Sequence, residues 1–122
     1  MDKRVLYIED NPQNMRLVRK ILHMGGYEII EAENGLEGVA KALSELPDLI
    51  LMDINLPDID GIEATRRIRA SDKTHSIPII ALTANAMQGD RERILEAGLN
   101  DYLSKPISKN ELLEKISSFV DS

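Results

Sequence analysis

Five short apolar runs separated by helical segments are the feature that most constrains the fold of this chain. The clearest run, residues 49–52, has no polar break and is followed directly by an acid, Asp53. A strand without alternation is covered on both faces, as in a parallel sheet flanked by helices. The alternation of strands and helices predicts right-handed crossovers and an α/β fold, a doubly wound parallel sheet with helices on both faces. The predicted strands are residues 5–8, 28–31, 49–52, 77–82 and 101–103.

Composition separates central from edge strands, and capping patterns mark the helices. Runs 5–8, 49–52 and 77–82 are almost wholly apolar and are predicted to be central, whereas 28–31 and 101–103 carry polar residues and belong nearer the edges.

Predicted helix starts are Asn11 before Pro12, and the pairs Asn34 and Glu37, Asp60 and Glu63, and Ser108 and Glu111. Gly25-Gly26 and Gly98 are predicted helix ends. Buried stripes are predicted at Val39 and Leu43, at Ile62, Thr65 and Ile68, and at Leu112, Ile116 and Val120.

Length and charge limit the possible functions. A chain of 122 residues fits one domain, residues 1–122, with a single core. The formal net charge of −6 argues against binding the phosphate backbone of DNA and favours small cations or basic protein surfaces as partners. The absence of cysteine, of a signal-like apolar stretch before the first strand and of any membrane-length apolar run predicts a cytoplasmic protein without a membrane anchor.

Charged and hydroxyl side chains follow four of the five predicted strands. They are Glu9 and Asp10, Asp53, Thr83 and Lys105. Ligands of open α/β sheets bind beyond the carboxyl ends of the strands, so these residues are expected to converge there. Three carboxylates in one place repel one another, and a hard divalent cation such as Mg²⁺ resolves the conflict. Lys105 is then expected to pair with Asp53 when the site is empty and with a phosphoryl oxygen when it is filled, and a cis bond to Pro106 could aim it inward.

Four stretches together resemble one family over essentially the whole chain. "YIEDN", "DLILMDINLPDIDG", "IPIIALTA" and "DYLSKPIS" are similar, in order and spacing, to the receiver domain of bacterial response regulators. The resemblance implies a flavodoxin-like (βα)5 fold with strand order 2-1-3-4-5. It does not distinguish a stand-alone receiver of the cell-cycle type from a receiver of a hybrid sensor kinase.

The resemblance also implies a role for each residue at the strand ends. Asp53 would be the phosphoacceptor and Lys105 the phosphate-binding lysine. Asp10 and Asp53 would hold Mg²⁺ or a substitute such as Mn²⁺, with Glu9 acting through water and the backbone carbonyl of Asn55 completing the shell.

A switch is implied in the second half of the chain. Thr83 and Tyr102 match the hydroxyl and aromatic switch positions, and they flank a predicted helix, residues 85–97, whose apolar stripe is the poorest of the five. The side chains of Asn55 and Asn85 would flank the approach of water to Asp53. Weak packing makes this helix the element expected to move.

The implied activity is signalling, with no catalysis beyond phosphorylation and dephosphorylation of the chain itself. A carboxylate can act as a nucleophile toward phosphorus, and Mg²⁺ with Lys105 would supply the charge neutralisation that phosphoryl transfer needs. Expected partners are a histidine kinase or a histidine phosphotransfer protein, with residues 14–19 as a candidate contact surface, and downstream target proteins.

Three other functions fit the sequence less well. "DIDG" (58–61) resembles a haloacid-dehalogenase phosphatase signature, but that motif should directly follow a buried strand, and this strand ends at Asp53. A calcium loop starting at Asp53 would place Pro57 at a ligand position and Asp58 where glycine is needed. A flavin or nucleotide module lacks its glycine-rich loop, and aromatic residues make up only 3% of the chain.

Overall fold

The computed structural model describes residues 2–84 and 88–121, which form a regular alternation of strands and helices. The elements are β1 (Arg4–Ile8), α1 (Pro12–Met24), β2 (Glu28–Ala32), α2 (Gly35–Glu45), β3 (Leu49–Asp53), α3 (Gly61–Arg69), β4 (Ile79–Thr83), α4 (Gln88–Glu96), β5 (Asp101–Ser104) and α5 (Lys109–Val120). The strands are parallel and lie in the order β2-β1-β3-β4-β5, so the predicted fold is confirmed.

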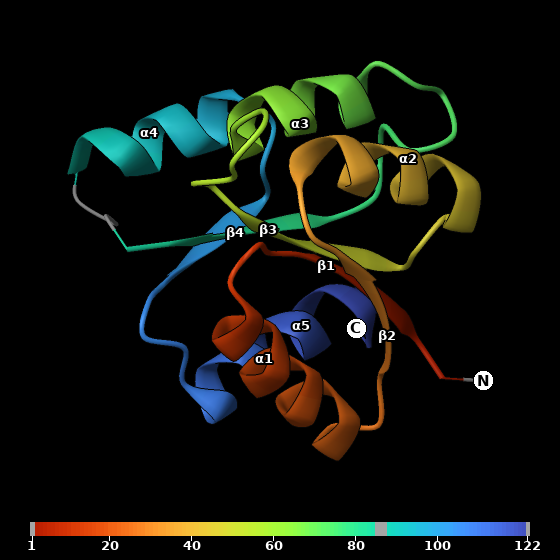
Figure 1. Ribbon diagram of the computed structural model, residues 1–122, viewed down its shortest axis with the longest axis vertical. Helices are drawn as coiled ribbons and strands as arrows, with labels where there is room; N and C mark the ends of the chain where they lie inside the picture. Colours follow the sequence, from red (N-terminus) through yellow and green to blue (C-terminus); the bar gives the residue numbers. More distant parts are fainter. Residues whose placement is uncertain (1, 85–87, 122) are drawn as a thin grey trace.

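The sheet separates two helical layers. Helices α1 and α5 cover one face, and α2, α3 and α4 cover the other (Figure 1). Side chains of β1 alternate between the two cores: Val5 and Tyr7 pack with α1 and α5, whereas Leu6 and Ile8 pack on the opposite side. The runs predicted to be central form β1, β3 and β4. Among the described residues, no helix combines the length and the apolar character needed to cross a bilayer.

The strand boundaries differ from prediction in a consistent way. Four of the five strands end one residue later than predicted, so that β3 includes Asp53 and β4 includes Thr83, whereas β1 ends at Ile8 as predicted. The fourth strand also begins at Ile79 instead of residue 77, because Pro78 has no N–H to donate to the ladder; its carbonyl still accepts from the N–H of Ile50 at 2.9 Å. Of the fourth predicted helix, residues 85–87 lie outside the described residues, and Gly98, with a φ of 102°, follows its end.

The loop after β3 is held by its own acids and by one glycine. Asp60 caps α3 as predicted, accepting from Glu63 N at 2.8 Å. Asp58 caps a different helix: its carboxylate accepts from the first two N–H groups of α2, each at 2.8 Å. A Cβ at Gly61 would lie 2.7 Å from the carbonyl oxygen of Asp53, so α3 can start this close to the strand end only with glycine there. The backbone around Asp53 is therefore tied to both α2 and α3.

The predicted stripe of α2 is wrong at one position. Leu43 is 38% exposed and Val39 is half-buried, whereas the buried positions are Gly35, Gly38 and Ala42. A Cβ at Gly38 would lie 2.4 Å from the Cδ1 atom of Ile8, so the helix packs against β1 through its smallest residues. This close approach turns Leu43 toward the surface. The stripes predicted in α3 and α5 are buried, with Val120 half-buried at the end of α5.

The outer edge of β2 is partly covered by side chains. The N–H of Glu28 donates to the carbonyl of Lys3, and the carbonyl of Ala32 accepts from the N–H of Glu9. The backbone groups of alternate residues, beginning at Glu28, therefore point toward β1, and those of Glu31 point toward the open side. The ammonium of Lys41 donates to the outward carbonyl of Glu31. Arg19 binds the Glu31 carboxylate through two contacts of 2.6 and 2.7 Å.

Candidate functional site

The carboxyl ends of β1, β3, β4 and β5 meet at one edge of the sheet and bring the predicted residues together. Glu9 and Asp10 follow β1, Asp53 ends β3, and Lys105 follows β5. Thr83 ends β4 and is buried, and its carbonyl accepts the N–H of Lys105 at 2.8 Å. Residues separated by up to 96 positions in the chain therefore form one site.

Three carboxylates form a compact cluster. Ligand oxygens of Glu9, Asp10 and Asp53 all lie within 4.8 Å of one another. Glu9 is 2% exposed and Asp53 is 3% exposed, whereas Asp10 is open to solvent. Two buried acids beside an exposed one provide hard oxygen ligands with an open side, the donor set and access that Mg²⁺ prefers. The chemistry of these residues thus fits a divalent cation.

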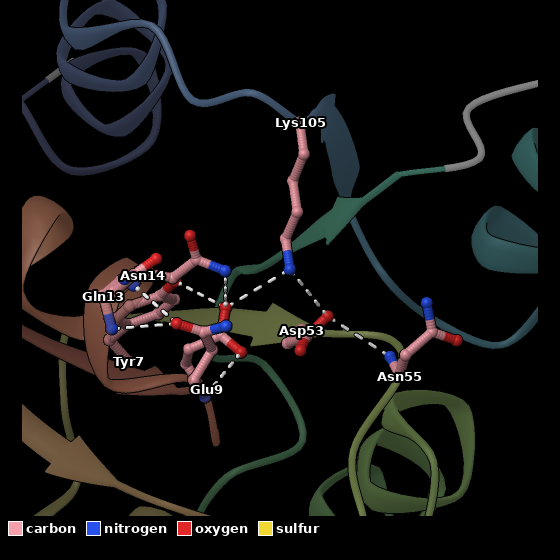
Figure 2. Close-up of polar contacts among 8 residues, drawn as sticks. Tyr7, Glu9, Gln13, Asn14, Asp53, Asn55 and Lys105 are labelled. Atoms are coloured by element: carbon pink, nitrogen blue, oxygen red, sulfur yellow. Dashed lines mark hydrogen bonds and ion pairs between the residues drawn. The ribbon is translucent and has the colours of Figure 1, made fainter.

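Lys105 lies between the two buried acids. Its Nζ atom is 3.3 Å from Oε1 of Glu9 and 3.2 Å from Oδ1 of Asp53 (Figure 2). The peptide bond between Lys105 and Pro106 is cis, and the side chain points into the site. The predicted ion pair with Asp53 is confirmed, and it extends to Glu9. One ammonium thus partly compensates two buried charges.

The environment separates the proton affinities of the two buried acids. Burial, followed by the hydrogen bond and the charge of Glu9, raises the pKa of Asp53 from 3.8 to about 6, against the opposing effects of Lys105 and of the Asn55 N–H. Burial acts in the same direction on Glu9, but its hydrogen bonds and the charge of Lys105 outweigh burial and lower its pKa. Without a metal, Asp53 is therefore the acid that gains a proton first.

Glu9 is held by hydrogen bonds that the sequence did not predict. Its Oε1 atom accepts from the hydroxyl of Tyr7 at 3.0 Å and from the side-chain amide of Asn14 at 3.2 Å, and its Oε2 atom accepts from the N–H of Asn11 at 3.3 Å (Figure 2). Burial and the negative charge of Glu9 raise the pKa of Tyr7, which keeps the phenol protonated as a donor. The spacing of Tyr7 and Glu9 on one strand is the signal that could have revealed this contact.

Asn55 contacts the site through its backbone. Its N–H donates to Oδ1 of Asp53 at 3.2 Å, while its side chain is exposed. The role of its carbonyl as a metal ligand stays a prediction. Asn85, expected to lie near the water path, is outside the described residues.

Tyr102, the predicted aromatic switch residue, lies beside α4. It is half-buried on β5, and the guanidinium carbon of Arg91 lies 5.9 Å from the centre of its ring. In α4, Ile94 is buried but Leu95 is 43% exposed, in keeping with the predicted weak packing of this helix.

Only part of the predicted contact surface, residues 14–19, is available to a partner, because the rest is buried or bonded within the protein. Within residues 14–19, Asn14 binds Glu9, and Met15 and Val18 are buried, which leaves Arg16, Leu17 and Arg19 exposed. A groove of about 520 Å³ is lined by Arg16 and Arg19 and also by Glu9 and Asp10. The exposed face of α1 therefore borders the acidic cluster.

Comparison with known proteins gives one consistent result. The family model described as "Response regulator receiver domain" matches residues 5–117. A curated relative, the polar-differentiation response regulator DivK of Brucella anthropi, is 47% identical over 120 residues, which is 98% of each chain.

Solved structures agree in fold over nearly the whole length. The receiver domain of the sensor histidine kinase PA1611 from Pseudomonas aeruginosa, solved with a magnesium ion coordinated in its active site cleft, is 43% identical, with a TM-score of 0.93 and full coverage of both chains. The receiver domain of the response regulator Ssk1 from Saccharomyces cerevisiae, solved with the histidine phosphotransfer protein Ypd1, is 33% identical. Its TM-score is 0.91, with coverage of 98% of this chain and 90% of the other.

Proposed function

The chain belongs to the response regulator receiver domain family, and from that premise we propose that it accepts a phosphoryl group on Asp53 and thereby switches its contacts with other proteins. The donor would be a phosphohistidine of a sensor kinase or of a phosphotransfer protein. The complex of a structural neighbour with Ypd1 supports the second kind of donor. Its only reactions would be its own phosphorylation and dephosphorylation.

The observation that carries this proposal is the position of Asp53, a buried carboxylate at a strand end with an ammonium 3.2 Å away and two further acids beside it. In the transfer step, an Asp53 oxygen bonds to phosphorus as the bond from phosphorus to the imidazole nitrogen breaks, and the bonding electrons leave with the imidazole. Lys105 then shifts its charge toward the phosphoryl oxygens. Positioning and charge neutralisation are the main requirements of such a step.

Mg²⁺ is the cation that we propose for the cluster. Asp10 and Asp53 would hold it directly, Glu9 through water, and the carbonyl of Asn55 would complete the shell. When bound, it would neutralise the charge that gathers on the phosphoryl oxygens during transfer. The magnesium ion in the cleft of the Pseudomonas aeruginosa receiver supports this choice. Mn²⁺ would serve as a substitute, since it also favours oxygen ligands.

The test is phosphorylation by a small acyl phosphate. Incubation with acetyl phosphate and Mg²⁺ should add one phosphoryl group to the intact mass of the protein, and EDTA should prevent it. Asp53→Asn should remove the adduct, whereas Asp72→Asn, an equivalent change at an exposed site between α3 and β4, should leave it unchanged. An adduct of equal yield in Asp53→Asn, or one insensitive to EDTA, would disprove the assignment.

A further inference from the structure

Tyr7 is an unusual residue for a central strand that is buried from Val5 to Ile8. The side chain is 0% exposed and lies in the core between the sheet and the α1/α5 layer. A buried phenol needs a hydrogen-bond partner for its hydroxyl. Phenylalanine would fill nearly the same space without that need. At Tyr7 the described partner is Glu9, with the hydroxyl oxygen 3.0 Å from Oε1.

The strand geometry explains the reach of this contact. Residues two apart on a strand point to the same face, so Tyr7 and Glu9 share the α1/α5 side of β1. The ring of Tyr7 extends along the strand and brings its hydroxyl to the carboxylate at the strand end (Figure 2). The hydroxyl thus approaches the acidic cluster from within the core, where the surrounding side chains fix its position.

The hydrogen bond from Tyr7 to Glu9 matters because Lys105, the charged donor to Glu9, is expected to turn away during phosphoryl transfer. Oε1 of Glu9 also accepts from Lys105 at 3.3 Å and from Asn14 at 3.2 Å. In the proposed transfer step Lys105 turns toward the phosphoryl oxygens, which removes one of these donors. Tyr7 and Asn14 remain, and of these Tyr7 is the more rigid, since Asn14 is half-buried in the first turn of α1.

We propose that Tyr7, with Asn14 as a second donor to the same oxygen, is a positioning residue that holds the Glu9 carboxylate in place for the cation. This inference rests on the proposed function of the site. Partners that orient the carboxylates of a metal site are known to set its affinity, because an unheld ligand must be ordered when the metal binds.

Tyr7→Phe tests this inference, and Tyr27→Phe is its matched control. Tyr27 also donates its hydroxyl to a carboxylate, that of Asp121 at 2.9 Å, at the opposite ends of the strands. Affinity is measured with Mn²⁺ by electron paramagnetic resonance and with Mg²⁺ by competition. The rate of phosphorylation by acetyl phosphate is followed against Mg²⁺ concentration.

Tyr7→Phe should raise the dissociation constant for both cations by up to about tenfold, the low end of the effect of losing a group that orients a direct metal ligand, because Glu9 would bind the cation through water. The Mg²⁺ concentration for half-maximal phosphorylation should move by the same factor, while the rate at saturating Mg²⁺ changes little. Tyr27→Phe should leave both quantities unchanged. In a Glu9→Gln background, Tyr7→Phe should have little further effect on affinity, because the carboxylate it positions is gone.

The outcomes separate the two proposals. If the unmodified protein binds neither cation, the proposed function fails. If it binds them and Tyr7→Phe binds them equally well, only the role of Tyr7 is overturned, whatever happens to the unfolding temperature. Equal losses in Tyr7→Phe and Tyr27→Phe would also overturn it. Should Tyr7→Phe not fold, Asn14→Ala must weaken binding in the same direction, and unchanged affinity there would overturn the positioning of Glu9.

Discussion

The ammonium nitrogen of Lys105 lies 3.2 Å from Oδ1 of Asp53, across 52 positions of the chain. This contact places a positive charge at the proposed phosphoacceptor before any cation or phosphoryl group is present. The lysine therefore stabilises the empty site and also competes with a cation for the same carboxylates. The two roles have opposite consequences when the lysine is removed.

Lys105→Met should tighten Mg²⁺ binding and slow phosphorylation. Removing a unit charge about 4 Å from the doubly charged cation lowers the repulsion by about 2 kcal/mol, or roughly thirtyfold in dissociation constant. Losing the lysine charge that would face the phosphoryl oxygens should slow the reaction with acetyl phosphate by about 100-fold. Calorimetric titration at pH 8, above the pKa of Asp53, and intact mass against time measure the two effects.

The control for this prediction is Lys109→Met, which removes an exposed lysine at the start of α5. It should change neither quantity. Weaker Mg²⁺ binding in Lys105→Met would show that the lysine organises the carboxylates for the metal and does not compete with it.

Asp53→Asn should make the protein more stable at neutral pH without Mg²⁺. Asp53 has a pKa of about 6 when folded and 3.8 as its ordinary value, so the folded state binds the proton more tightly. Stability from this group is complete below pH 3.8 and is lost as the pH rises to about 6, at a cost of roughly 2–3 kcal/mol. The amide does not ionise and avoids this loss.

Urea unfolding in EDTA at pH 7.5 and pH 4 measures the difference between the two proteins. It should be large at pH 7.5, shrink toward pH 4, and shrink at pH 7.5 when Mg²⁺ is added. A difference that stays constant with pH would place its origin in packing rather than in the charge of Asp53.

Asp10→Asn should weaken Mg²⁺ binding at least about tenfold, because one anionic ligand is lost from the open side of the cluster. Since Asp10 is exposed, the fold should keep its unfolding temperature in EDTA. Mg²⁺ titration of the phosphorylation rate reports the change, and Asp72→Asn serves as the control. Identical titration curves for Asp10→Asn and the unmodified protein would reassign the metal site.

Thr83→Ala should keep phosphorylation of Asp53 but lose most of the shift that follows it. The Thr83 hydroxyl is expected to move toward the phosphoryl group and free space for the ring of Tyr102, which would have to leave Arg91. Amide NMR spectra with and without a phosphoryl mimic report the shift, and Thr83→Ser, which keeps the hydroxyl, should preserve it. If residues 84–103 stay silent in the unmodified protein, this surface is not the switch.

The ends of β1, β3, β4 and β5 could be read from the sequence to within one residue, because each of these apolar runs stops at a polar residue. The position of Asp53 after a run buried on both faces was enough to place it at the sheet edge, and the parallel topology brought Lys105 to it.

Other features needed coordinates. Tyr7 reads as an ordinary core residue, since only the path of its ring shows that the hydroxyl reaches Glu9. The buried face of α2 was misjudged because hydrophobic patterns give no weight to Gly38, whose missing side chain is what allows the contact with Ile8. The role of Asp58 has no local signature in the sequence, because its carboxylate bonds to the start of α2, 22 and 23 positions away.

The covered edge of β2 has a consequence for the behaviour of the protein in crowded solution. An incoming strand from another molecule needs the outward carbonyl groups of an edge strand as acceptors. At Glu31 that carbonyl is already bound by Lys41, and Arg19 lies across the side chain. A second chain could extend the sheet here only by breaking these contacts and bringing its own backbone against charged groups. At Glu31 the edge is thereby protected against fibril-like pairing with another chain.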